Sequence, residues 1–159
     1  MNLIENKERI FSQVAQAMET ANRTDQVNVI AVTKYVGIDQ AKALVDTGVR
    51  HIGENRVDKF LEKYQALKDE GLTWHLIGSL QRRKVKEVIN FVDYFHALDS
   101  MKLAQEIQKR ASHPIKCFIQ VNISGEESKH GFAPEELDAL LPEIEALDNL
   151  QIVGLMTMA

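Results

Sequence analysis

Short apolar runs alternate with amphipathic stretches along the whole chain. In residues 3–22, apolar side chains recur three or four positions apart, which is the spacing of one helix face. The apolar run at residues 27–32 follows and is typical of a strand buried on both faces. The same alternation predicts further helices over residues 38–45, 57–67, 85–92, 103–111 and 137–147, and further strands over residues 49–53, 72–77, 94–98, 115–123 and 150–156.

Glycine and proline stand where these predicted elements should end or begin. Gly48 follows the second predicted helix, where a left-handed cap is favoured, and Gly71 closes the third. Pro134 suits the first turn of the last predicted helix, because that position needs no backbone donor. These residues support the boundaries that the hydrophobic pattern predicts.

Strict alternation of strands and helices predicts parallel βαβ units. Two architectures fit: a doubly wound open sheet, or a (β/α)8 TIM barrel cut short, since a whole barrel needs about 200 residues or more. The last predicted strand ends at residue 156 of 159, which favours a barrel fragment. No repeat or linker divides the chain. We therefore expect one domain over residues 1–159, with about six of eight strands and incomplete at the C-terminus.

Composition and charge exclude several classes of protein. The 159 residues are 45% hydrophobic and 26% charged, which are ordinary globular values. The net charge of −4 does not suit binding to nucleic acid or to an anionic membrane. One cysteine permits neither an internal disulfide nor a zinc site of several cysteines, and no metal site is expected. No apolar run is long enough to span a membrane, and the charged N-terminus does not resemble a signal peptide, so we expect a cytoplasmic protein.

Ligands of parallel α/β folds lie at the carboxyl ends of the strands, so the residues there are the candidates for chemistry. Lys34 follows the apolar run of the first predicted strand. A lysine held in an apolar setting loses its proton more easily, and the neutral amine can form a Schiff base with an aldehyde such as pyridoxal phosphate. The alternative is a solvated lysine at a strand end.

Two further candidate residues have a structural alternative beside the functional one. Asn55 offers a donor and an acceptor to a ring hydroxyl, but it also stands where it could cap the helix that begins at Arg56. His75 shares a strand face with Ile77, opposite Trp74 and Leu76. If that face is the barrel interior, His75 is near the site; otherwise it is a hydrogen-bonded core histidine.

Five motifs in order resemble the YggS/PROSC family of pyridoxal phosphate homeostasis proteins. They cover the chain from about residue 27 to its end and consist of Ala31-Val32-Thr33-Lys34, His51-Ile52-Gly53-Glu54-Asn55, Trp74-His75-Leu76-Ile77-Gly78, Gln120-Val121-Asn122-Ile123-Ser124-Gly125-Glu126-Glu127-Ser128-Lys129 and Gly154-Leu155-Met156-Thr157-Met158.

The resemblance implies a barrel similar to the N-terminal domain of alanine racemase, with pyridoxal 5'-phosphate (PLP) bound as an aldimine to Lys34. Asn55 matches an asparagine near the cofactor, and His75 and Met156 match positions that line the pocket. Members of the family are thought to carry or buffer the cofactor without established catalytic turnover. PLP-dependent enzymes are the implied acceptors, and a full-length protein is expected to be a monomer.

The sequence also departs from the family pattern. Thr33 stands where the family often has serine, and Arg83 stands where an asparagine is usual. The family continues for about two more βα units, which hold the phosphate-binding groups and the arginine that faces the pyridine nitrogen. We therefore expect this chain alone to bind PLP weakly or not at all. We also expect its unpaired strand edges to favour self-association.

A PLP-dependent amino-acid racemase is the alternative function. Racemisation needs a second base opposite the lysine, because protons are handled on both faces of the α-carbon. In alanine racemases, a tyrosine from a second, all-β domain supplies that base, and this chain has no such domain. This favours the carrier. A truncated product that folds poorly and a doubly wound nucleotide-binding domain remain further alternatives, the latter lacking a glycine fingerprint after the first strand.

Overall fold

The computed structural model describes residues 2–127 and 130–159. Ser128 and Lys129, at the end of the fourth motif, lie outside the described residues. Six strands form one sheet in the order of the sequence, and every neighbouring pair is parallel. They are β1 (Ile30–Val32), β2 (His51–Glu54), β3 (Thr73–Leu76), β4 (Tyr94–Leu98), β5 (Ile115–Gln120) and β6 (Leu150–Met156). Because a doubly wound sheet reverses its strand order, this sequential order is that of a barrel.

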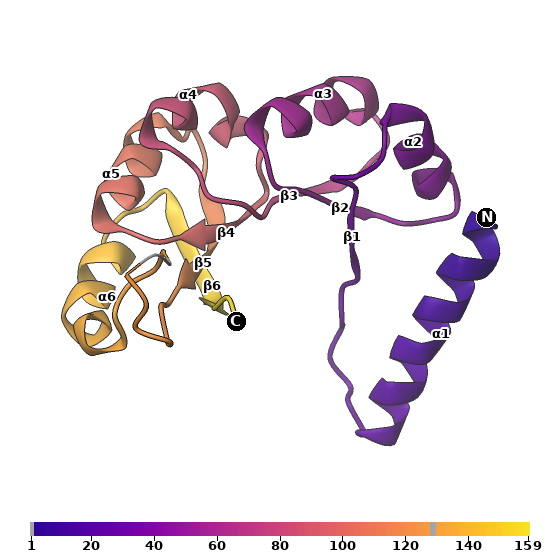
Figure 1. Cartoon of the computed structure of the whole chain (residues 1–159), viewed down its shortest axis with the longest axis horizontal. Helices are drawn as coiled ribbons and strands as arrows, with labels where there is room; N and C mark the ends of the chain where they lie inside the picture. Colours follow the sequence, from indigo (N-terminus) through magenta and orange to yellow (C-terminus); the bar gives the residue numbers. More distant parts are fainter. Residues whose placement is uncertain (1, 128–129) are drawn as a thin grey trace.

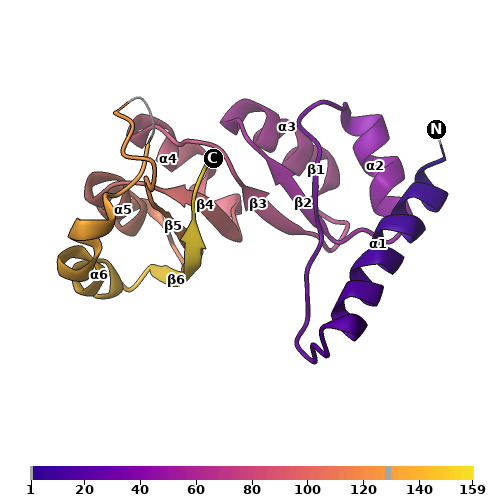
Figure 2. The same cartoon turned by 60° about the horizontal axis from the view of Figure 1, so that its bottom comes forward.

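The helices are α1 (Leu3–Thr20), α2 (Ile38–Asp46), α3 (Val57–Leu67), α4 (Val85–Val88), α5 (Met101–Arg110) and α6 (Leu137–Glu145). The strands trace an open arc, and α2 to α6 follow its outer side (Figure 1). α1 lies beside α2 at the β1 end of the arc (Figure 2) and has no fully buried residue. The main core is therefore formed between the strands and the helices from α2 onward.

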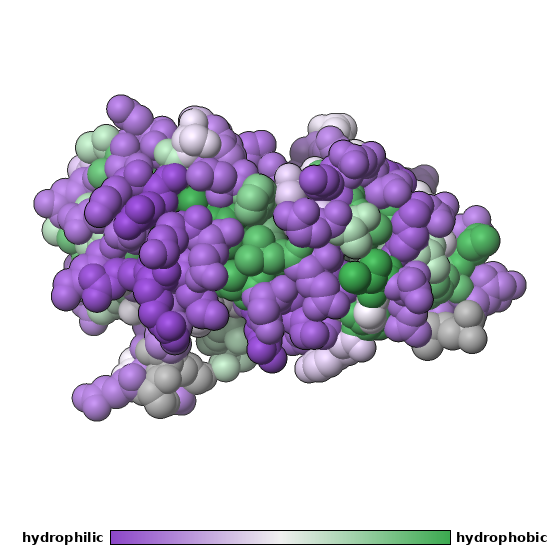
Figure 3. Space-filling model, turned by 90° about the horizontal axis from the view of Figure 1, so that it is seen from above, coloured by the Kyte–Doolittle hydropathy of each residue, from purple (hydrophilic) through white to green (hydrophobic). Residues whose placement is uncertain are grey.

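The two faces of the strands have different surroundings. Ile52 and Trp74 are register partners and point toward the helices, where Trp74 packs against the rings of Phe60 and Tyr64 at centroid distances of 5.6 and 5.2 Å. Successive residues of a strand point to opposite faces, so His75 lies on the concave face of the arc. Seen from the helix side, the surface is largely hydrophilic, with hydrophobic residues exposed in a few patches (Figure 3).

Most predicted elements are present, and the differences have physical causes. The strand predicted at 27–32 begins only at Ile30, because β1 is an edge strand and its register with β2 starts there. The strand predicted at 115–123 ends at Gln120, and Val121 makes only a single bridge, to Phe132.

The helix predicted at 85–92 is the third difference. Only Val85–Val88 is α-helical; the short helix η1 (Arg82–Lys84) precedes it and η2 (Ile89–Phe91) follows it. All four apolar residues of the predicted face, Val85, Val88, Ile89 and Val92, are β-branched and therefore weak helix formers.

The predicted capping residues stand where expected. Gly48 and Gly71 have φ angles of +108° and +70°, which disfavour residues with a Cβ atom. Pro134 begins the short helix η3 (Pro134–Glu136), which leads into α6. No helix in residues 2–127 and 130–159 is both long and apolar enough to cross a membrane.

Candidate functional site

A cleft of about 420 Å³ lies at the carboxyl ends of the strands. It is lined by residues that end or directly follow β2, β3, β5 and β6, and by one residue of β4. The lining residues are Asn55, Ile77, Gly78, Ser79, Ala97, Gln120, His130, Met156, Met158 and Ala159. This volume is within the usual range for small-molecule sites. The structure therefore gathers Asn55 and Met156, two of the predicted site residues, around one cavity.

Asn55 lies where β2 passes into α3. The N-cap of α3 is Arg56, and no side chain caps this helix, so the capping alternative for Asn55 is wrong. The backbone of Asn55 lies close to β3, because a Cβ atom on Gly78 would stand 2.4 Å from the Asn55 carbonyl oxygen. A glycine at position 78 thus permits the close approach of these two strand ends.

Lys34 is exposed, and its Nζ atom lies 5.1 Å from the ring centroid of Tyr35. It follows β1 in a turn that the Val36 amide closes by donating to the Thr33 carbonyl oxygen over 3.2 Å. The sequence suggested that Lys34 could lie in an apolar setting. The structure differs, because the Lys34 side chain is exposed in the turn after β1, a strand that pairs with β2 alone among the described strands. Lys34 does not line the cleft. The register Val32↔Gly53, continued by two residues, brings it level with Asn55.

A buried polar network lies beneath this turn. Lys63 of α3 donates from Nζ to Oε2 of Glu54 at 2.6 Å and to the carbonyl oxygen of Thr33 at 2.9 Å. The Thr33 hydroxyl donates to the same Glu54 oxygen. The Lys63 and Glu54 side chains are 3% and 1% exposed. No local sequence pattern indicates this network, because it joins residues from three separate parts of the chain.

His75 is the middle member of a chain of three histidines on the concave face. Its Nε2 atom lies 3.0 Å from Nδ1 of His51, and its Nδ1 atom lies 2.9 Å from Nε2 of His96. Its ring stacks on Tyr94 at a centroid distance of 4.6 Å. His75 is therefore a buried, hydrogen-bonded histidine, and it does not line the cleft that contains Asn55.

The surroundings of the histidine chain favour the uncharged form of its rings. Burial, together with the neighbouring His96 and His51, lowers the pKa of His75 from 6.5 to about 3. Burial also lowers the pKa values of His51 and His96, with the charge of Asp93 acting in the opposite direction at His51. With every ring neutral, each N–H···N contact has one donor and one acceptor. No group of three or more His, Cys, Asp or Glu side chains among the described residues is arranged to hold a metal ion.

Met156 and two residues that the sequence analysis did not assign complete the far side of the cleft. Met156 ends β6 and is the register partner of Gln120, the last residue of β5. The Gln120 amide donates to the His130 carbonyl oxygen at 3.4 Å. His130 Nδ1 lies 3.6 Å from Oδ2 of Asp99, and burial raises the pKa of that carboxyl. The sequence did not single out Gln120, because the strand was predicted to continue to residue 123 and the structure ends it at Gln120.

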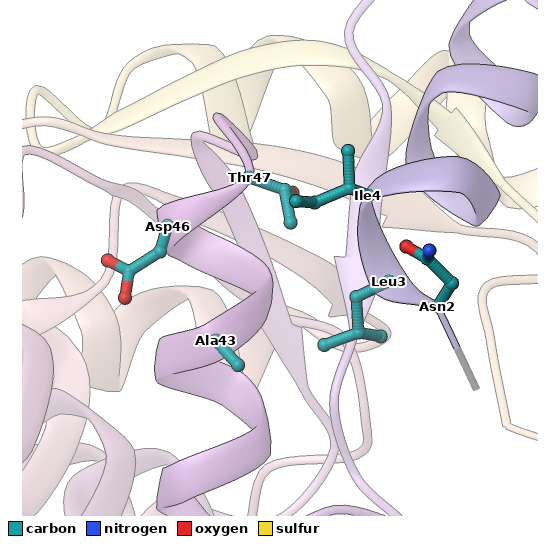
Figure 4. A pocket seen from close by; sticks show the side chains of 6 residues that line it. All are labelled: Asn2, Leu3, Ile4, Ala43, Asp46 and Thr47. Carbon is teal, nitrogen blue, oxygen red and sulfur yellow. The ribbon is translucent and has the colours of Figure 1, made fainter.

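Other features of the structure do not resemble a site of this kind. A second hollow lies between the start of α1 and the end of α2, where Leu3 and Ile4 face Ala43 and Thr47 (Figure 4). Its lining residues come from α1, α2 and the residues that flank these helices, and none belongs to a strand. Cys117 is buried in β5, and burial raises the pKa of its thiol to about 12.

Comparison with known proteins gives consistent results. The family described as alanine racemase, N-terminal domain, matches residues 6–159. A pyridoxal phosphate homeostasis protein of Aquifex aeolicus is 40% identical over 162 residues, covering 99% of this chain and 71% of the relative. The structure of PipY from Synechococcus elongatus, with PLP bound, has a TM-score of 0.83 at 30% identity and covers 99% of this chain and 71% of PipY.

An alanine racemase of Clostridium difficile has a TM-score of 0.69 at 20% identity, covering 85% of this chain and 37% of that one, and supports the fold alone. The sequential parallel sheet with outer helices is thus a partial (β/α)8 barrel of the alanine racemase N-terminal type. Within that class, the chain belongs to the family of pyridoxal phosphate homeostasis proteins. The predicted resemblance and fold class are confirmed.

Proposed function

We propose that this chain binds pyridoxal 5'-phosphate at the carboxyl ends of its strands and serves cofactor homeostasis as a carrier without catalytic turnover. The observation that carries the proposal is the placement of Lys34 level with Asn55, on the strand end next to the cleft. The names of the Aquifex aeolicus and Synechococcus elongatus relatives support the choice of cofactor. Lys34 and Asn55 belong to the motifs that the chain shares with the family.

The residues present fit part of the cofactor. The cleft combines apolar side chains, such as Ile77 and Met156, with the amides of Asn55 and Gln120. This is the mixture that an aromatic ring with a hydroxyl group requires. None of the described lining residues is lysine or arginine, so the cleft offers no lysine or arginine to pair with the phosphate. This composition supports the expectation that the chain alone binds PLP weakly.

The proposed role of Lys34 is covalent and reversible. Lys34 would hold the cofactor through its amine, and the aldehyde of bound PLP would supply a reversible condensation with that amine in which water is released. Hydrolysis reverses the step and returns both partners unchanged, which suits a carrier. The exposed side chain is accessible both to free cofactor and to an acceptor enzyme. The racemase alternative has less support, because the Clostridium difficile alanine racemase resembles this chain in fold alone.

The test is the visible absorption spectrum of the chain after PLP is added, followed by borohydride reduction and peptide mapping. We expect a band that reduction fixes on Lys34 and that Lys34→Ala abolishes. Lys59→Ala is the matched control, since Lys59 is an exposed lysine of α3. Labelling spread evenly over many lysines would contradict the proposal. Conversion of L- to D-alanine by the PLP-loaded chain would instead support the racemase.

A further inference from the structure

Lys63 is placed where an apolar residue would be expected. The buried residues of α3 are Val57, Phe60, Lys63 and Leu67, spaced three or four apart, so they form the face of the helix that packs on the sheet. Desolvating an ammonium group on such a face is costly unless a charged partner with good geometry lies close by. Glu54 is that partner, with its side chain 1% exposed.

Net stability does not explain this ion pair well. A buried ion pair is often no more stabilising than well-packed apolar residues of the same volume. Here the Glu54 carboxylate is also incompletely satisfied, because its buried Oε1 atom has no hydrogen-bond partner in the described part of the chain. All of the described contacts of the carboxylate converge on its other oxygen. This asymmetry indicates that the Glu54–Lys63 ion pair serves to fix the positions of neighbouring groups rather than to add net stability.

The geometry that it imposes is that of the turn carrying Lys34. Thr33 is held at its amide by the Gly53 carbonyl oxygen, at its carbonyl by Lys63, and at its hydroxyl by Glu54. The Thr33 carbonyl oxygen also accepts the Val36 amide that closes the turn. Among the strands that the structure describes, β1 pairs with β2 alone. The contacts of Thr33 with Glu54 and Lys63 therefore restrain the end of β1, which within the described sheet is paired only with β2.

We propose that Glu54 and Lys63 are positioning residues that hold the Thr33–Val36 turn so that Lys34 stays level with Asn55, beside the cleft. This inference rests on the proposed role of Lys34. Lys63 acts through the Thr33 carbonyl oxygen, and Glu54 acts through the Thr33 hydroxyl and by keeping Lys63 in place. Neither side chain needs to contact the cofactor. Both are buried, so a cofactor that enters from solvent does not reach them.

The test uses the double variant Glu54→Gln/Lys63→Met, which removes both buried charges while conserving side-chain volume. Two quantities are measured: the rate at which PLP and borohydride label Lys34, and hydrogen exchange of the Val36 amide without PLP. We expect the labelling rate to fall about tenfold or more, because small misplacements of a reacting group are costly. We also expect faster exchange at Val36, with little change in the melting temperature. A merely structural ion pair would alter neither the labelling rate nor the exchange in a variant that remains folded.

The matched control is Lys59→Met/Glu62→Gln, which removes an exposed ion pair on the same helix. It should leave labelling and Val36 exchange unchanged. If Lys34 of the wild-type chain is labelled selectively and the double variant behaves like this control, the positioning inference is overturned while the proposed function stands. If Lys34 of the wild-type chain is not labelled selectively, the proposed function itself fails, and the inference fails with it.

If the double variant does not fold, a second pair of variants tests the same inference. Thr33→Val removes the hydroxyl that donates to Glu54, and Thr33→Ser keeps it. The valine variant should label Lys34 more slowly and exchange the Val36 amide faster than the serine variant. Equal behaviour of the two variants would contradict a role for Glu54 in holding the turn.

Discussion

The Nζ atom of Lys63 lies 2.9 Å from the carbonyl oxygen of Thr33, so α3 is hydrogen-bonded to the end of β1. The two residues come from different βα units, and the contact crosses the layer between helices and sheet. It places a positive charge under the turn that carries Lys34, with Glu54 as its counter-ion. Removing one or both members of this ion pair should therefore have different consequences for stability.

We expect Lys63→Met alone to destabilise the chain by about 3–5 kcal/mol, because it leaves the Glu54 carboxylate buried without its partner. Adding Glu54→Gln should restore most of the loss, leaving less than about 1.5 kcal/mol. Urea unfolding of the two single variants and the double variant measures these differences as a thermodynamic cycle. Additive losses in the double variant would show that the two side chains are not coupled.

Gly78→Ala should destabilise the chain by about 1–3 kcal/mol, since its new Cβ atom would stand 2.4 Å from the Asn55 carbonyl oxygen. Relief of that contact requires the ends of β2 and β3 to separate, so the variant should also bind PLP more weakly. The control is Gly37→Ala, where nothing lies within 4 Å of the added atom. Unfolding curves and PLP titration of both variants measure the effects. Equal losses in the two variants would contradict the packing argument.

The histidine chain should make the protein sensitive to acid. The pKa of His75 is lowered from 6.5 to about 3, so between these values the unfolded chain binds a proton there that the folded chain does not. Stability therefore falls as the pH falls below about 6.5, by about 2 kcal/mol from His75 alone at pH 5. His51 and His96 are shifted in the same direction and add to the loss.

The measurement is urea unfolding at about pH 7.5 and pH 5, where most surface carboxylates are ionised in both states. His75→Gln removes the titrating group but keeps a donor and an acceptor, and it should reduce the pH dependence by about 2 kcal/mol. His113→Gln, at an exposed histidine, is the control. An unchanged pH dependence in His75→Gln would show that the buried chain is not the source of acid sensitivity.

The edge strands should promote self-association. Leu155 of β6 and Val32 of β1 are 66% and 49% exposed, and each lies on an outermost strand of the described sheet. Exposed apolar strand edges pair readily with other chains. Light scattering over a wide concentration range should show association, and Leu155→Lys should weaken it without lowering the melting temperature. A wild-type chain that remains monomeric at high concentration would contradict this expectation.

The hydrophobic pattern predicted most of the fold, because helix and strand periodicities are local properties of the sequence. Residues 94–98 and 150–156 were predicted as strands and form β4 and β6. The errors lie where tertiary context decides. Residues 27–29 are apolar but do not join β1, which pairs with β2 only from Ile30. Gln120 was quoted in a motif but not assigned to the site, since only the packing of β5 beside β6 brings it to the cleft.

The sequence by itself determined the alternating βα order, the glycine and proline boundaries, and the motifs that carry the family resemblance. These depend on side-chain periodicity, backbone preference and residue identity, all of which can be read locally. Only the tertiary structure decided that Lys63 reaches Thr33, that His75 joins His51 and His96, and that Lys34 is exposed. The physical reason is that burial and hydrogen-bond partners arise from the packing of elements distant in the chain, which no local pattern records.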